Sequence, residues 1–120
     1  MEIIQYINWA IVALTIGFGA FGWLAPRYTM KKVDLKDGGS TMGMSEVRAV
    51  SGALFVVAGI GALILATPAA YAMLGFIWAG GALGRVTSLA VDGRTSTKWI
   101  FAGTESAVAA TALIINMGIS

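Results

Sequence analysis

Two ionisable residues lie inside stretches that are otherwise apolar, and they are the side chains best placed to do chemistry. Arg85 lies seven residues before Asp92, and Glu105 lies seven residues after Lys98. If the stretches before Asp92 and after Lys98 are helices, each charge lies roughly 10 Å along its helix from the connection that joins the two. Because charged groups are costly inside a membrane, they are functional candidates by default. The matching depth predicts that Arg85 and Glu105 form an ion pair.

Four further charged residues are expected at the same end of the helices and complete a candidate polar cluster. The cluster has three acidic and three basic members, so it is neutral when fully ionised. A carrier coupled to protons or cations needs an unpaired acid, whereas a balanced set suits a structural clamp, in which loss of one buried partner costs about 3–5 kcal/mol. We favour the clamp over transport or catalysis. The cluster comprises Glu46, Arg48, Arg85, Asp92, Arg94 and Glu105.

The composition removes several other chemistries. The chain has no Cys and no His, so these side chains supply no thiolate nucleophile, disulfide, imidazole base, or zinc or haem ligand. Asp34 and Asp37 lack the alternating oxygen ligands of a calcium loop, and no phosphate-binding or dinucleotide fingerprint occurs. The net charge of +2 is too small for a nucleic-acid footprint. We therefore expect no cofactor, no metal and no nucleic-acid partner.

Transmembrane helices are the elements that must position these charges. Apolar residues make up 58% of the 120 residues and charged residues only 12%, about half the usual charged fraction. A bilayer core needs roughly 20 apolar residues per helix, and four stretches meet this length without the alternation of β-barrel strands. We expect an all-α, polytopic membrane protein: one domain over residues 1–120, with four transmembrane helices in an antiparallel bundle. The expected helices cover about residues 3–25, 45–66, 69–91 and 98–118.

Local signals set the expected ends of these helices. Ser45 is a good N-cap residue for the second helix, and the candidate caps for the fourth are Thr95, Ser96 and Thr97. Pro68 disfavours helical backbone at the residue before it, which separates the second helix from the third. Gly93 is the left-handed residue expected just past the third helix. The stretch from Pro26 to Met44 is expected to be a loop.

The distribution of Lys and Arg predicts the orientation. Four of the eight lie between residues 26 and 44, and Arg94 and Lys98 lie at the third connection, whereas the second connection and both termini carry none. The positive-inside rule places both basic connections in the cytoplasm and both termini outside. Trp23 and Tyr28 agree with an interface at the inner end of the first helix. Because no basic residue precedes this helix, we expect it to be retained rather than cleaved as a signal peptide.

Small residues indicate where the helices pack. Membrane helices associate through close packing at Gly, Ala and Ser. Gly80 and Gly84 form a GxxxG pair in the third helix, and Gly52 lies among small residues of the second. We expect these three glycines to contact neighbouring helices. A groove that admits a lipid tail or a partner helix is the alternative.

Amide side chains lie near the outer ends of the first and fourth helices. Asn116 lies eleven residues after Glu105, three turns along the same helix face. Gln5 and Asn8 lie near the outer end of the first helix. Hydrogen bonds between these amides are expected to be worth about 0.6–2 kcal/mol each. We expect them to be structural.

Two stretches resemble a known family. The second helix opens with E-x-R-A-x-x-G, and the last two helices carry G-R-x-x-S-L-x-x-D-G-R-x-S followed by a Glu. Over about Ser45–Leu113 the chain resembles small bacterial four-helix membrane proteins classified as a domain of unknown function, and more loosely the DoxX-like group of assembly factors and accessory subunits. The resemblance implies a bacterial inner (cytoplasmic) membrane and no established activity. The matching positions are Glu46, Arg48, Ala49, Gly52, Gly84, Arg85, Ser88, Leu89, Asp92, Gly93, Arg94, Ser96 and Glu105.

The sequence favours a function in binding rather than catalysis. We expect a non-enzymatic accessory or scaffolding subunit, or a binder of a lipid-like ligand, with the charged clamp on the cytoplasmic side. Its partners would be the lipid bilayer and either a larger membrane complex or further copies of the chain. A small proton- or ion-coupled transporter using Glu105 is the alternative, and an enzyme acting on a lipid or quinone headgroup is a weaker one. Small multidrug-resistance transporters do not fit, because their essential carboxylate lies in the middle of the first helix, where this chain has only Glu2 at the very end.

Overall fold

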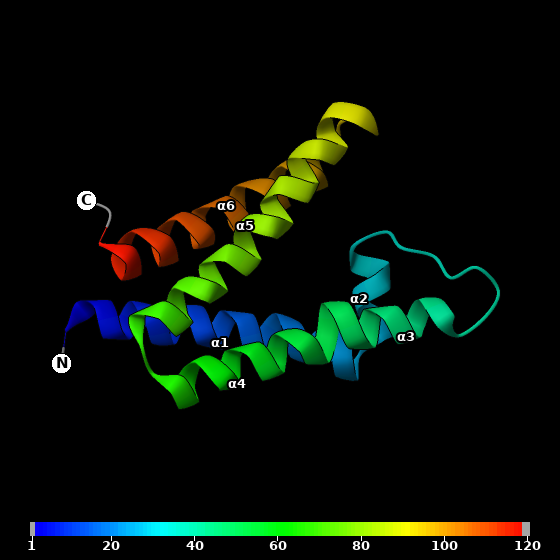
Figure 1. Ribbon diagram of the computed structural model, residues 1–120. Coiled ribbons are helices and arrows are strands. Elements are labelled where there is room, and N and C mark those ends of the chain that lie inside the picture. The colour runs from blue at the N-terminus through cyan, green and yellow to red at the C-terminus, as the bar shows by residue number, and fades with distance from the viewer. Residues whose placement is uncertain (1, 119–120) are drawn as a thin grey trace. The chain divides into compact units, whose positions relative to one another are not determined.

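The computed structural model describes residues 2–118, and all regular secondary structure in that range is helical. The all-α class expected from the sequence is therefore confirmed. Three consecutive elements, the second of them the π-helical turn η1, form one uninterrupted helix from Met42 to Leu65. The elements are α1 (Ile3–Leu24), α2 (Pro26–Lys32), α3 (Met42–Arg48), η1 (Ala49–Ala53), α4 (Leu54–Leu65), α5 (Pro68–Val91) and α6 (Ser96–Met117) (Figure 1).

Four helices are long and apolar enough to cross a membrane. Each has 22 or 24 residues, and at about 1.5 Å per residue this matches a hydrocarbon core roughly 30 Å thick. Large apolar side chains such as Phe21, Leu83 and Ile100 are exposed along them, which suits contact with lipid. The lengths and compositions are those of a multi-pass membrane protein. The four helices are Ile3–Leu24, Met42–Leu65, Pro68–Val91 and Ser96–Met117.

The chain forms two compact units that divide α1 between them. The first unit contains α1 as far as Ile11, together with the chain from Leu65 onward, and so includes α5 and α6. The second unit is Val12–Ile64 and contains the rest of α1 with α2, α3, η1 and α4. Each unit has its own packing, and the charged residues of the expected cluster are distributed over both.

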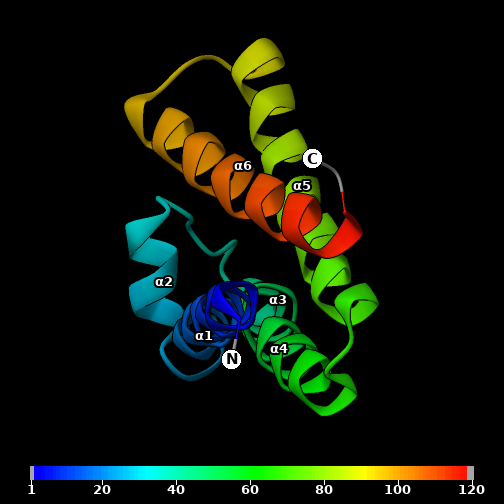
Figure 2. The same cartoon turned by 90° about the vertical axis from the view of Figure 1, so that its left-hand side faces the viewer.

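In the first unit, α5 and α6 form a hairpin and lie side by side (Figure 2). The hydroxyls of Thr67 and Thr95 cap the two helices, and each accepts a backbone N–H three residues further on at 3.2 Å. Gly93, with φ +97°, follows the end of α5, and Gly118, with φ +70°, follows α6. Since these angles are strained for other residues, the two glycines set where the helices end.

Gly75 and Gly81 give α5 its close approach to α6. A methyl group added at Gly75 would lie 3.0 Å from side chains of α6, and one added at Gly81 would lie 2.5 Å from Glu105 Oε2. A methyl group added at Gly80 or Gly84 would meet no neighbouring atom within 4 Å. Adjacent helical residues are rotated by about 100° from one another, so the GxxxG pair expected at a helix contact lies off the face of α5 that packs on α6.

In the second unit, α1 packs against the helix formed by α3, η1 and α4. A methyl group at Gly52 would lie 2.5 Å from the backbone nitrogen of Trp23, and one at Gly19 would lie 2.7 Å from the carbonyl oxygen of Gly52. One at Gly22 would collide with the carbonyl of Ser51. Gly52 therefore lies in a helix contact, at which the two backbones almost touch.

The connection before this helix differs from the expectation. The sequence predicts a loop over residues 26–44, but Pro26–Lys32 forms the short helix α2. Proline at the first helical position has a suitable φ and no N–H that would remain unbonded. The prediction that Ser45 caps the second helix is also wrong, because the helix begins one turn earlier, at Met42. The hydroxyl of Ser40 accepts the N–H of Met42 at 3.2 Å.

Candidate functional site: an ion pair between α5 and α6

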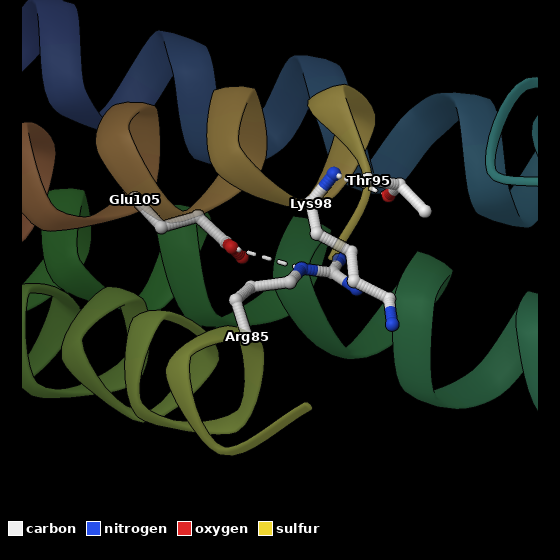
Figure 3. A network of polar contacts seen from close by, with 4 residues as sticks. All are labelled: Arg85, Thr95, Lys98 and Glu105. Atoms are coloured by element: carbon white, nitrogen blue, oxygen red, sulfur yellow. Dashed lines mark hydrogen bonds and ion pairs between the residues drawn. The ribbon is translucent and has the colours of Figure 1, made fainter. Parts of the chain in front are cut away.

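The ion pair expected from helical depth is present in the structure. Nε of Arg85 donates a hydrogen bond to Oε1 of Glu105 at 3.1 Å (Figure 3). The Arg85 side chain is 41% exposed and that of Glu105 is 18% exposed. The guanidinium carbon of Arg85 also lies 4.9 Å from the centre of the Phe101 ring, a cation–π contact. Both charges therefore have partners within the hairpin.

Gly81 provides the space for the carboxylate of Glu105. While Oε1 of Glu105 accepts the bond from Arg85, Oε2 lies over the Cα of Gly81, where a methyl group would come within 2.5 Å of it. The sequence motifs do not single out Gly81. Its signal is its spacing, because it precedes Arg85 by four residues and so shares its face of α5.

Two other members of the expected cluster lie in the connection between α5 and α6. Asp92 and Arg94 are exposed, and within residues 2–118 the only ion pair is the one between Arg85 and Glu105. Nζ of Lys98 donates to the carbonyl oxygen of Gly93 at 2.9 Å. At this end of the hairpin, the expected network is thus reduced to a single pair.

The remaining two members, Glu46 and Arg48, belong to the second unit. Arg48 does not pair with an acid there. Its Nη1 donates to the carbonyl oxygen of Trp23 at 2.7 Å, at the end of α1, where a cation complements the helix dipole and the unpaired carbonyl groups. Glu46 is exposed. In this unit, Arg48 acts as a cap on α1.

The two asparagines of the first unit bond to one another. Nδ2 of Asn8 donates to Oδ1 of Asn116 at 2.9 Å, and Nδ2 of Asn116 donates to Oδ1 of Asn8 at 2.7 Å. Nδ2 of Asn116 also donates to the carbonyl oxygen of Ala112 at 2.8 Å. Of the two amides considered in α1, it is Asn8 rather than Gln5 that reaches α6. The reciprocal pair ties the start of α1 to the end of α6.

Asn8→Leu is expected to lower the free energy of unfolding by about 0.6–2 kcal/mol, because the amide of Asn116 would lose its partner in apolar surroundings. Thermal unfolding in detergent micelles, followed by circular dichroism, measures the change. Gln5→Leu is the matched control, since Gln5 is exposed and its side chain makes no hydrogen bond within residues 2–118. Equal melting temperatures for the two variants would contradict the assigned role of the asparagine pair.

No cluster of possible metal ligands is found among the described residues. Between Glu2 and Gly118, no group of three or more Asp and Glu side chains is arranged to hold a metal ion. The ion pair between Arg85 and Glu105 is neutral as a whole and hydrogen-bonded. Such a pair is suited to holding two helices in register.

Four long apolar helices, two of them joined by an ion pair, are typical of a small multi-pass membrane protein. A family model described as a domain of unknown function (DUF4345) matches residues 3–116. The chain belongs to this family. The match includes the first helix and so extends beyond the stretch from Ser45 to Leu113 that carries the motifs. No curated protein and no solved structure shows a significant match to the chain.

Proposed function

We propose that this protein is a non-enzymatic accessory or scaffolding subunit of a membrane-protein assembly. The observation that carries the proposal is the 3.1 Å bond between Arg85 and Glu105. Ion-coupled transport and acid–base catalysis need an acid that can exchange its partner. The acid that lies deepest in the α5–α6 hairpin is instead bonded to a cation and seated on Gly81. This arrangement is therefore better suited to a chain that binds other membrane components than to transport or acid–base catalysis.

We further propose a four-helix antiparallel bundle in a bacterial inner membrane, with the basic connections in the cytoplasm and both termini outside. The distribution of Lys and Arg supports this orientation through the positive-inside rule. The aromatic residues Trp23 and Tyr28, next to the basic residues of α2, support an interface at that level. Met1 and residues 119–120, to which the placement of the termini refers, lie outside the described residues.

One face of α5 supports association with another membrane helix. Gly80 and Gly84 are exposed, and a methyl group added at either would meet no neighbouring atom within 4 Å. The large apolar residues Phe76 and Leu83 beside them are exposed as well. In membranes, two small residues four apart allow the backbone of a partner helix to approach closely. This face would contact either a larger complex or a second copy of the chain.

Affinity purification in mild detergent, followed by mass spectrometry, tests the proposed association. We expect the wild-type chain to retain a larger membrane protein or a second copy, and Gly84→Ile to lose most of it, because the added side chain blocks close approach. Gly103→Ile is the matched control, since Gly103 lies in α6 and also has nothing within 4 Å. A wild-type chain that purifies as a monomer with no partner would contradict the proposal.

A proton-coupled transporter using Glu105 is the second candidate. One observation favours it: the Arg85 side chain is 41% exposed, so the cation of the pair is accessible from outside the hairpin. This candidate predicts solute uptake driven by a pH gradient in liposomes, abolished by Glu105→Gln. Retention of a partner by the Glu105→Gln variant, together with no uptake by the wild type, would reject the transporter and support the accessory subunit.

A further inference from the structure

We propose that a groove at the end of α1 binds the headgroup of an anionic phospholipid, with one acyl chain lying along η1. The groove has a volume of about 410 Å³ and lies wholly in the second unit. This inference rests on the membrane location given under the proposed function but not on the ion pair between Arg85 and Glu105. The residues that line the groove include Trp23, Thr41, Ser45, Arg48, Ala49 and Ala53.

The polar part of the groove offers hydrogen-bond donors and a positive charge. Arg48 supplies the charge, Thr41 and Ser45 supply hydroxyls, and no carboxylate lines the groove. An arginine has five N–H donors, and the bond from Nη1 to the carbonyl oxygen of Trp23 uses one of them. That bond fixes the guanidinium at the groove, while its other donors have no partner within residues 2–118. An anionic, acceptor-rich group complements such a lining.

The apolar part of the groove suits a hydrocarbon chain. Ala49 and Ala53 are the first and last residues of η1 and continue the wall from Arg48 towards the apolar helix α4. Their methyl groups leave room where larger side chains would fill the groove. π-helical turns are frequent at functional sites, and here the turn follows directly after the arginine. A ligand that is anionic at one end and apolar at the other matches this lining.

The surroundings favour a phospholipid over a soluble anion. Trp23 and Tyr28 belong to the aromatic class that lies at headgroup level. Lys31 and Lys32 lie in the last turn of the adjoining α2, and basic residues at this level are attracted to an anionic leaflet. A second groove, of about 530 Å³ and lined by residues 27–37, mixes basic side chains with Asp34 and Asp37. It therefore lacks the uniform charge of the groove at Arg48.

Native mass spectrometry of the purified full chain with phosphatidylglycerol tests the proposal. A hydrogen bond to a charged group is worth about 1.5–3 kcal/mol, so Arg48→Gln is expected to weaken phosphatidylglycerol binding about ten- to a hundredfold. Lys36→Gln is the matched control, because it removes one positive charge from the same unit without touching the groove at Arg48, and it should weaken binding much less than Arg48→Gln does. Equal losses in the two variants would overturn the proposal.

A second variant and two further ligands separate the parts of the inference. Ala49→Leu keeps Arg48 in place and fills the groove, so it should also weaken phosphatidylglycerol binding. This variant tests the groove even if Arg48→Gln fails to fold. Phosphatidylcholine should bind more weakly than phosphatidylglycerol, and millimolar inorganic phosphate should not displace the lipid. No effect of Ala49→Leu, equal binding of both lipids, or displacement by phosphate would each overturn the proposal. If the Arg48→Gln variant loses the lipid but still co-purifies with a partner, and Gly84→Ile still disrupts that association, the lipid site and the proposed function are separate.

Discussion

Gly52→Ala is expected to lower the free energy of unfolding by about 1–3 kcal/mol. The added methyl group would lie 2.5 Å from the backbone nitrogen of Trp23, and a backbone atom cannot turn away as a flexible side chain can. Either α1 moves away from η1 or the helix distorts. Gly22→Ala should have a similar effect, because its methyl group would meet the backbone of Ser51 on the opposite side of the same contact.

Unfolding by sodium dodecyl sulfate from mild-detergent micelles, followed by circular dichroism, measures this loss. Gly61→Ala is the matched control in α4, since nothing lies within 4 Å of a methyl group there. Alanine is favoured over glycine in a helix by up to about 1 kcal/mol, so the control should be unchanged or stabilised. If Gly52→Ala unfolds at the same detergent fraction as Gly61→Ala, α1 and η1 do not cross as closely as the structure shows.

Arg85→Ala and Glu105→Ala are each expected to cost about 2–3 kcal/mol, because each leaves the surviving charge without its partner inside an apolar helix pair. The value lies below the range for a fully buried pair since the Arg85 side chain is 41% exposed. The double variant should lose less than the sum of the two single losses, by an interaction energy of about 0.5–3 kcal/mol. The same detergent titration measures all three variants.

Asp92→Ala, Arg94→Ala and their double variant form the matched control cycle. These residues carry the same two charges but lie in the connection and make no ion pair within residues 2–118. Their substitutions should change the free energy of unfolding by less than about 0.5 kcal/mol each and should add. Strict additivity in the Arg85 and Glu105 cycle would mean that these two residues do not stabilise the hairpin as a pair.

The sequence was sufficient to predict the ion pair because depth can be counted from helix ends. Arg85 and Glu105 each lie a similar number of residues from the connection, and antiparallel helices bring equal depths together. The packing glycines were harder to predict. A GxxxG spacing identifies two glycines on one face, but it does not say which face meets α6. The structure uses Gly81, one position further along, and there a carboxylate occupies the space that the glycine leaves.

The partner of Arg48 could not be predicted from charge patterns. The sequence groups Arg48 with acids because these are its complementary side chains, whereas the structure gives it the carbonyl oxygen of Trp23. Every residue has such an oxygen, so only the path of the chain decides which one is available. The same holds for η1, since the π-helical turn lies where Gly52 meets α1, and that contact is tertiary.

The bond between Asn8 and Asn116 joins residues that are 108 positions apart, which has a consequence for the order of synthesis. At about 5–20 residues per second, the ribosome needs about 5–20 s after making Asn8 before Asn116 exists. Throughout that time, the first helix carries a polar amide whose final partner has not been made. The first unit is complete only when the last turns of α6 have been made, so that amide gains its partner only after Asn116 has been synthesised.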